Sequence, residues 1–240
     1  MAAAGECYSA ERSRPLRFLG ISALLLAVSS CPLMAQDESR SVLDVLSEIA
    51  PKLRGRLTKR FTEHGAVYPP AELTLIAYKK ERKLEIWVPR RKGWVKVVSY
   101  KILAASGERG PKLREGDEQV PEGVYRLTDL NPNSKFHLSI RVDYPSARDL
   151  EWAERDQREN LGGDIFIHGN EVSRGCLAIG DERIEELFTL VADTGVENAR
   201  IIIAPDRRMK HLATEPAWVG ELYDEVRRAL EEIRVKMPPH

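Results

Sequence analysis

The sequence contains little cysteine, with three in 240 residues, which is too few for a fold that depends on disulfides. It has no excess charge, since 37 basic residues balance 37 acidic ones. Such a chain is not expected to be a general nucleic-acid-binding protein, because those proteins gain affinity by neutralising phosphates. What is present is an ordinary globular composition, with 42% hydrophobic and 31% charged residues over a length that supports a hydrophobic core.

The first 35 residues have the pattern of a secretory signal. Three arginines within 11–17 precede an uncharged run at 18–30, and Ala35 stands before a polar stretch. The run is shorter than the about 20 residues of a spanning helix. The pattern therefore predicts export to the periplasm, with a buried or interfacial helix as the alternative. Val28-Ser-Ser-Cys31 also resembles a bacterial lipobox. Cleavage after Ala35 and lipidation of Cys31 are therefore the two alternatives for processing, and a lipid on Cys31 would attach the protein to a membrane.

The rest of the chain divides into a helical segment at 36–69, a central domain at 70–206 and a C-terminal helical segment at 207–240. Apolar residues at helical spacing predict helices at 42–53, from Asp181 as the cap to Gly195, and at 219–233. Apolar and alternating runs predict strands at 73–78, 84–88, 94–98, 124–127, 136–142, 164–167 and 200–204. This order predicts an α+β fold that is mainly antiparallel.

Polar segments connect these elements. Residues 105–123 are expected to form a long loop, which in a compact domain is usually functional, and 146–163 a second loop or a short helix. The basic clusters at 79–83 and 90–92 are expected to be solvated hairpin turns, with a functional basic patch as the alternative.

Cys176 and His168 are the residues that indicate chemistry. His168 ends a predicted strand, and Cys176 follows after a polar loop. A thiol is a nucleophile only as thiolate, and a neighbouring imidazole can take its proton. Gly175 allows a turn in which the amides of residues 175 and 176 face an oxyanion, and Gly169 leaves room for its carbonyl to orient the ring. From these residues alone, a nucleophile, a structural cysteine and a metal site remain open, although no CxxC or HxxxH motif supports the metal.

Ile167-His-Gly169 followed by Ser173-Arg-Gly-Cys176 resembles the catalytic signature of the YkuD-type L,D-transpeptidases. Val120-Pro-Glu-Gly-Val-Tyr125 is similar to a strand that precedes this signature in the family. The resemblance covers residues 70–205. It implies a β-sandwich-like catalytic domain with flanking N- and C-terminal helices, no metal or other cofactor, and Cys176 as a nucleophile served by His168. It also implies inhibition by carbapenem-type β-lactams.

Two features of the sequence depart from the main pattern of the family and narrow the resemblance to one subgroup. The gap between histidine and cysteine is short, and Arg174 stands where the family has a second histidine. Both features resemble the YafK-like murein subgroup, which includes an enzyme that cuts a lipoprotein from peptidoglycan. Transfer and hydrolysis therefore both remain open.

The implied substrate is a peptidoglycan stem peptide, with a wall-attached lipoprotein as a second partner and no nucleic acid. Candidates for substrate contact are Ser173, Arg174, Lys112, Glu115 and His137. Each has a plainer alternative as a turn, surface or strand residue. The expected protein is a periplasmic cysteine acyl-transferase. A murein amidase with the same thioester chemistry and a non-catalytic cell-wall-binding module are the alternatives.

Overall fold

The computed structural model describes residues 39–210 and 212–235, so the predicted signal segment, with Ala35 and Cys31, lies outside the described residues. Within those ranges no helix combines the length and apolar character that crossing a membrane requires. In chain order the elements are α1 (Val42–Glu63), β1 (Leu73–Tyr78), β2 (Lys83–Pro89), β3 (Trp94–Lys101), β4 (Gly123–Ser134), β5 (His137–Val142), α2 (Ala147–Arg155), β6 (Phe166–His168), β7 (Leu177–Ala178), α3 (Asp181–Thr194), the 3-10 helix η1 (Val196–Asn198), β8 (Ala199–Ala204) and α4 (Val219–Val235).

The strands form one eight-stranded sheet in the order β3-β2-β1-β8-β4-β5-β6-β7. The pairs β1–β8 and β6–β7 are parallel and the other pairs are antiparallel, which confirms the predicted α+β class. β4 joins the two halves of the sheet. Its first residues pair with β8 and its later residues with β5, with a shift in register between Leu127 and Asp129. The sandwich-like domain is thus one continuous sheet whose halves share β4.

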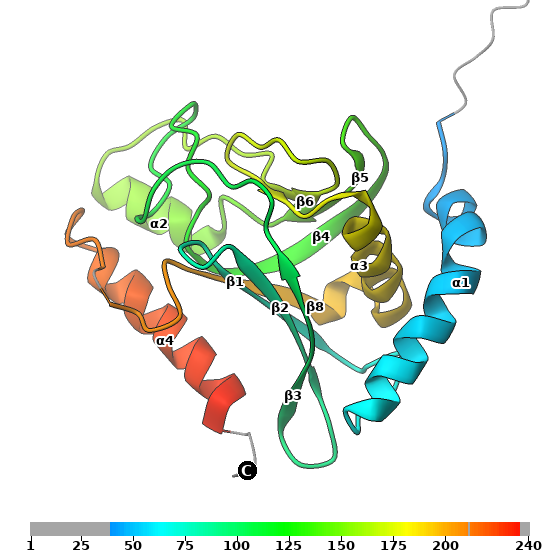
Figure 1. Ribbon diagram of the computed structural model, residues 1–240. Helices are drawn as coiled ribbons and strands as arrows, with labels where there is room; N and C mark the ends of the chain where they lie inside the picture. The colour runs from blue at the N-terminus through cyan, green and yellow to red at the C-terminus, as the bar shows by residue number, and fades with distance from the viewer. Residues whose placement is uncertain (1–38, 211, 236–240) are drawn as a thin grey trace, which may run out of the picture. The chain divides into compact units, whose positions relative to one another are not determined.

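The central strands are buried on both faces, which explains their nearly continuous apolar sequences. In β1, Leu75 and Ala77 face one core, which also contains side chains of α1 and α3. Ile76 and Tyr78 face a second core, which contains the apolar stripe of α4. Figure 1 shows the same division, with α4 on one side of β1, β2 and β8 and with α1 and α3 on the other.

The first helix is longer than its apolar pattern predicts, since α1 continues from residue 53 to Glu63. Leu57 and Phe61 extend its buried stripe, and arginines of this added stretch pair with acids of α3. Arg54 contacts Asp193 at 2.7 Å, and Arg60 pairs with the buried Glu186. Partners more than a hundred residues away therefore stabilise a stretch that looks too polar for a helix when it is considered alone.

Two further expectations differ from the structure. β4 extends to Ser134 and turns directly into β5, because the irregular register around Pro132 allows a proline to lie within a strand. Asp181 does not cap α3. The N-cap is Gly180, which has a φ of 82°, and Asp181 is the first helical residue. Its carboxylate accepts a hydrogen bond from the amide of Asn170 at 2.7 Å instead, so it holds the loop that follows His168.

The segment 105–123 is the predicted long loop, and a buried ion pair anchors it. Lys79 Nζ lies 3.1 Å from Glu122 Oε1 and donates to the carbonyls of Gly110 and Val120. Glu122 also accepts from the Gly110 amide and from the Tyr223 hydroxyl, each at 2.9 Å. Lys79, the residue after β1, thereby ties Gly110 in the loop to Val120 and Glu122 near its end.

Candidate active site

Cys176 is the residue immediately before β7, the strand that pairs with β6. Ile167 pairs with Leu177 and His168 with Ala178, so continuing this parallel register places Cys176 beside Phe166. The sulfur agrees with that placement, because the Phe166 amide donates to Sγ at 3.4 Å. The thiol itself donates to the Asp164 carbonyl at 3.5 Å. Cys176, which precedes β7, and His168 of β6 therefore lie diagonally across this pairing, and no hydrogen bond joins the two side chains among the described residues.

His168 is held in one tautomer. Its Nδ1 lies 2.6 Å from the Gly169 carbonyl, and because a carbonyl oxygen only accepts, Nδ1 carries the proton. Nε2 is left as the unprotonated nitrogen. The ring of Phe136 stacks on the imidazole with centroids 4.6 Å apart, and His168 is only 2% exposed. The orienting role expected of the Gly169 carbonyl is thus present in the structure.

Gly169 has no space for a side chain. A Cβ at this position would lie 2.5 Å from Asp181 Oδ1 and 2.6 Å from the Phe136 carbonyl. Glycine is therefore required here by the close approach of the β4–β5 turn and the start of α3, and not by its backbone freedom.

The amides of Gly175 and Cys176 do not face open space, contrary to the expectation that they point at an oxyanion. The Gly175 amide donates to Ser106 Oγ at 2.5 Å, and the Cys176 amide donates to Ser173 Oγ at 3.0 Å. Both hydroxyls are also used as donors, Ser106 to the Glu118 carbonyl and Ser173 to the Cys176 carbonyl. The physical reason is that a buried backbone N–H takes an available acceptor when no substrate supplies one.

Burial determines the protonation states of Cys176 and His168. It raises the pKa of the Cys176 thiol above its ordinary value, and the Phe166 amide opposes this only in part. Burial also lowers the pKa of His168, against the opposing effect of the Gly169 carbonyl. At neutral pH the pair is therefore a thiol and a neutral imidazole, not a preformed thiolate and imidazolium. Such an imidazole is suited to accept the thiol proton during attack.

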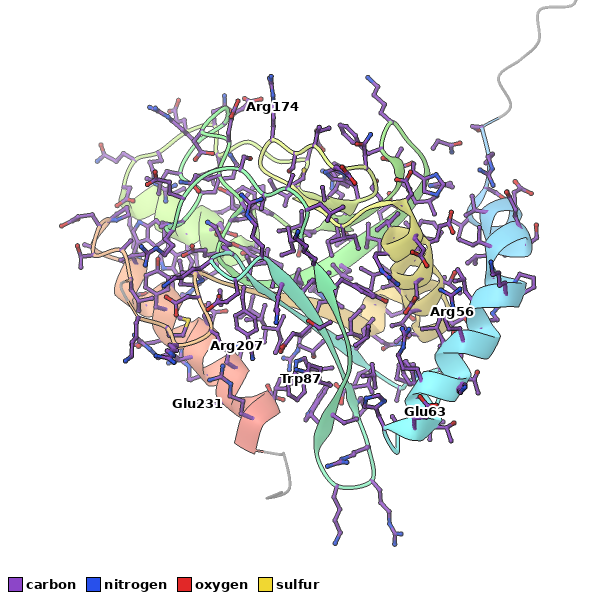
Figure 2. The ribbon with its side chains drawn as sticks, viewed as in Figure 1. Arg56, Glu63, Trp87, Arg174, Arg207 and Glu231 are labelled. Carbon is purple, nitrogen blue, oxygen red and sulfur yellow. The ribbon has the colours of Figure 1, made fainter. Side chains whose placement is uncertain are left out.

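Four of the predicted residues, Lys112, Glu115, Arg174 and Gly175, line one cavity of about 320 Å³. Its lining includes Gly175, the residue before Cys176, but neither Cys176 nor His168. The carboxylates of Glu118 and Asp164 lie along the same wall, so acids outnumber bases there. Lys112 is buried, and its ammonium group bonds Asp117 at 2.5 Å and the Arg114 carbonyl at 2.8 Å. Arg174 is exposed on the loop before Cys176, on the side of the molecule where the long loops gather (Figure 2).

Ser173 and His137 are not among the residues that line this cavity. The Ser173 hydroxyl holds the backbone of Cys176 through two hydrogen bonds, so its observed contacts are those of a turn residue. His137 lies at the β4–β5 turn with a φ of 73°, and its Nε2 is 2.8 Å from Glu185 Oε1. The structure thus separates these two from the other substrate-binding candidates.

Sequence reasoning missed two residues that shape the site. Ser106, 69 positions earlier in the chain, accepts the hydrogen bond of the Gly175 amide. The ring of Phe136 stacks on the imidazole of His168. A single sequence contains no signal for either contact, although both residues lie in or beside segments with turn-like composition. Asp117 was missed as well. Its carboxylate accepts from the amides of residues 113, 114 and 119, and so it closes the loop around Lys112.

Comparison with known proteins gives one family. The family model for YkuD, described as the L,D-transpeptidase catalytic domain, matches residues 73–203. YafK of Escherichia coli strain K12 and YafK of E. coli O157:H7 are each 33% identical to this chain over 135 residues. The match covers 54% of this chain and 52% of each relative, so it spans about half the length of the curated relatives.

Solved structures are more distant. The helical cell shape determining protein of Campylobacter jejuni is 22% identical, with 57% of this chain and 48% of that chain covered and a TM-score of 0.47. L,D-transpeptidase 1 of Mycobacterium tuberculosis is 13% identical, with 55% and 61% covered and a TM-score of 0.31. Both TM-scores lie below 0.5, so the family assignment depends on the sequence match.

Proposed function

Because this chain belongs to the YkuD family of L,D-transpeptidase catalytic domains, we propose that it is a cysteine acyl-transferase acting on peptidoglycan stem peptides through a thioester on Cys176. The observation that carries the proposal is the pairing of Nδ1 of His168 with the Gly169 carbonyl. This contact leaves Nε2 as a free base on the strand next to the thiol.

The first half-reaction forms the thioester. His168 Nε2 takes the proton of the Cys176 thiol while the sulfur attacks the carbonyl carbon of a diaminopimelate residue. A carbon–sulfur bond forms, and the bond from that carbon to the nitrogen of the terminal D-alanine breaks. The leaving nitrogen takes the proton from the imidazolium, which returns His168 to its neutral form.

In the second half-reaction an amine of another stem peptide attacks the thioester. A carbon–nitrogen bond forms, the carbon–sulfur bond breaks, and the amine proton returns through His168 to the sulfur. The cavity lined by Gly175 supports an amine as the acceptor, since Glu115 and Glu118 line it and have no cationic partner among the described residues. Water in place of the amine would give the hydrolase that remains the alternative.

The proposal includes export to the periplasm, because peptidoglycan lies there. It is supported by the basic and uncharged pattern of residues 11–30 and by Ala35 before the polar stretch. Attachment to the membrane follows only if Cys31 carries a lipid. A wall-attached lipoprotein is the proposed partner if the thioester is hydrolysed.

Intact-mass measurement after exposure to a carbapenem-type β-lactam tests the thiol. We expect one covalent adduct on the wild-type chain, none on Cys176→Ala, and an unchanged adduct on Cys31→Ala, the matched control for a cysteine elsewhere in the sequence. An unmodified wild type would favour a non-catalytic wall-binding module. An adduct that persists in Cys176→Ala would assign the reaction to another group.

Muropeptide analysis separates transfer from hydrolysis. The full chain is incubated with a stem peptide that ends in D-alanine, with and without a second amine-bearing peptide. We expect a cross-linked product when the acceptor is present. Release of D-alanine without any cross-link, at equal rates in both reactions, would favour the hydrolase.

A further inference from the structure

A second cavity, of about 560 Å³, is lined in part by Ser106, which contacts Gly175. Its walls come from the β1–β2 turn, from the first part of the 105–123 loop and from Leu212 and Ala213 before α4. Basic residues dominate the lining, which includes Lys79, Lys80, Arg82 and Arg109 against the one carboxylate of Glu108. Three residues of the basic cluster at the β1–β2 turn, Lys79, Lys80 and Arg82, therefore line this cavity.

The positive charge of this cavity is not neutralised within the described part of the chain. Lys79 is paired with Glu122, but Lys80 and Arg109 form no ion pair with any described residue. Arg82 donates to the Leu103 carbonyl, which leaves its charge uncompensated. The cavity lined by Gly175 has the opposite character, with Glu115, Glu118 and Asp164 on its walls. An anionic group is therefore favoured in the second cavity and disfavoured in the first.

The backbone segment that begins at residue 103 connects the two cavities. Residues 103 and 104 pair with Ala178 of β7, at 2.8 Å from the Leu103 amide to the Ala178 carbonyl. Ser106, two residues further, lines the basic cavity and accepts from the Gly175 amide. A group bound in the basic cavity thus lies against the segment that contacts the residue before the nucleophile.

We propose that this basic cavity is a subsite for a carboxylate of a peptidoglycan stem peptide, held by Lys80 and Arg109. The proposal rests on the proposed function, and it deepens that function by assigning a separate place for an acidic end of the substrate. Stem peptides carry free carboxylates, whereas the glycan strand to which they are attached offers mainly hydroxyl and amide groups. A planar guanidinium group beside an ammonium group suits a carboxylate, because Arg109 can donate two parallel hydrogen bonds.

Calorimetric titration with the full chain tests the subsite. The Cys176→Ala background prevents turnover, and the probe is a soluble stem peptide that contains diaminopimelate and ends in D-alanine with a free carboxylate. Lys80→Gln/Arg109→Gln is expected to raise the Kd about tenfold, equivalent to about 1.4 kcal/mol. Lys92→Gln, a cation at the β2–β3 turn outside this cavity, serves as the matched control and should leave the Kd unchanged.

Two further arms identify the ligand. The same peptide with its carboxylates amidated should bind more weakly, and its Kd should not respond to the double variant. Inorganic phosphate should displace the free peptide only weakly. A Kd for the free peptide that the double variant leaves unchanged would overturn the proposal, as would phosphate binding tighter than the peptide, which would indicate a phosphate-bearing polymer.

Carbapenem acylation of the same variants with Cys176 intact distinguishes the failure of the subsite from the failure of the function. The wild type and the control Lys92→Gln should both form the covalent adduct on Cys176, because Lys92 lies outside both cavities. Normal acylation together with an unchanged Kd would remove only the subsite. Absence of acylation in the wild type would remove the function on which the subsite rests.

Discussion

The protonation states of His168 and Cys176 lead to a specific pH profile. The imidazole is an active base only when neutral, and burial holds its pKa below its ordinary value of about 6.5. The acylation rate of the wild-type thiol should therefore rise as pH passes upward through that lowered pKa and reach a plateau near neutrality. The sign follows from the direction of the shift, since a lower pKa leaves the base free at a lower pH.

Replacing His168 with glutamine should remove the plateau of the acylation rate near neutral pH. Without His168, the reaction depends on the thiolate that forms spontaneously, which for a thiol of pKa about 8.5 is about 3% at pH 7. Burial raises the pKa of Cys176, so the fraction is smaller still. General-base catalysis contributes about 10²- to 10⁴-fold, and His168→Gln should lose a factor of that size at pH 7. Its rate should then rise about tenfold per pH unit, because each unit raises the thiolate fraction tenfold.

Stopped-flow measurement of carbapenem acylation between pH 5 and 10 provides the assay. Phe136→Ala is the matched variant, because it uncovers the imidazole without removing it. Its acidic limb should move to higher pH as the pKa of His168 returns toward the ordinary value. A His168→Gln rate within threefold of wild type at pH 7 would refute the base assignment. A Phe136→Ala profile that is identical to wild type would refute burial as the cause of the lowered pKa.

Two further predictions concern the loop anchor and the tight contact at the histidine. Lys79→Met should lower the free energy of unfolding in urea by about 3–5 kcal/mol, because it leaves the buried carboxylate of Glu122 without its cation. The double variant Lys79→Met/Glu122→Gln should recover much of that loss. Equal stabilities for the single and the double variant would contradict this reasoning. Gly169→Ala should destabilise the fold by about 1–3 kcal/mol, because its Cβ would overlap atoms of Asp181 and Phe136. Gly55→Ala, whose Cβ would meet nothing within 4 Å, should be neutral or stabilising in thermal melts, and a similar loss for both would point to a general intolerance of alanine.

Local patterns were enough to predict most of the fold. The runs at residues 73–78 and 200–204 are apolar because both faces of β1 and β8 are covered, and such runs are read directly from the sequence. The errors lie where distant residues decide the structure. The second half of α1 is helical because α3 supplies acids to its arginines, and Asp181 fails to cap α3 because the Asn170 amide takes its carboxylate.

The difference between local patterns and contacts with distant residues also explains what could be predicted of the site. Cys176, His168 and Gly169 are close in sequence, so their relation follows from one loop between neighbouring strands. Lys112, Glu115 and Arg174 meet in one cavity, which the polarity of the long loop suggested without giving its position. The contacts of Ser106 and Phe136 cross between segments that only the folded chain brings together.

The occupied amides determine what must change before the proposed reaction can proceed. The proton of the Ser106 hydroxyl is directed to the Glu118 carbonyl and that of Ser173 to the Cys176 carbonyl, so neither hydroxyl offers a donor to an oxyanion. A substrate oxygen can gain the Gly175 amide only by displacing Ser106 Oγ, which exchanges one acceptor for another at little net cost if the oxyanion carries the charge. Ser106 also lines the basic cavity, so a carboxylate bound there contacts the segment that must shift. Ser106 is therefore the residue that both lines the second cavity and accepts the hydrogen bond of the Gly175 amide.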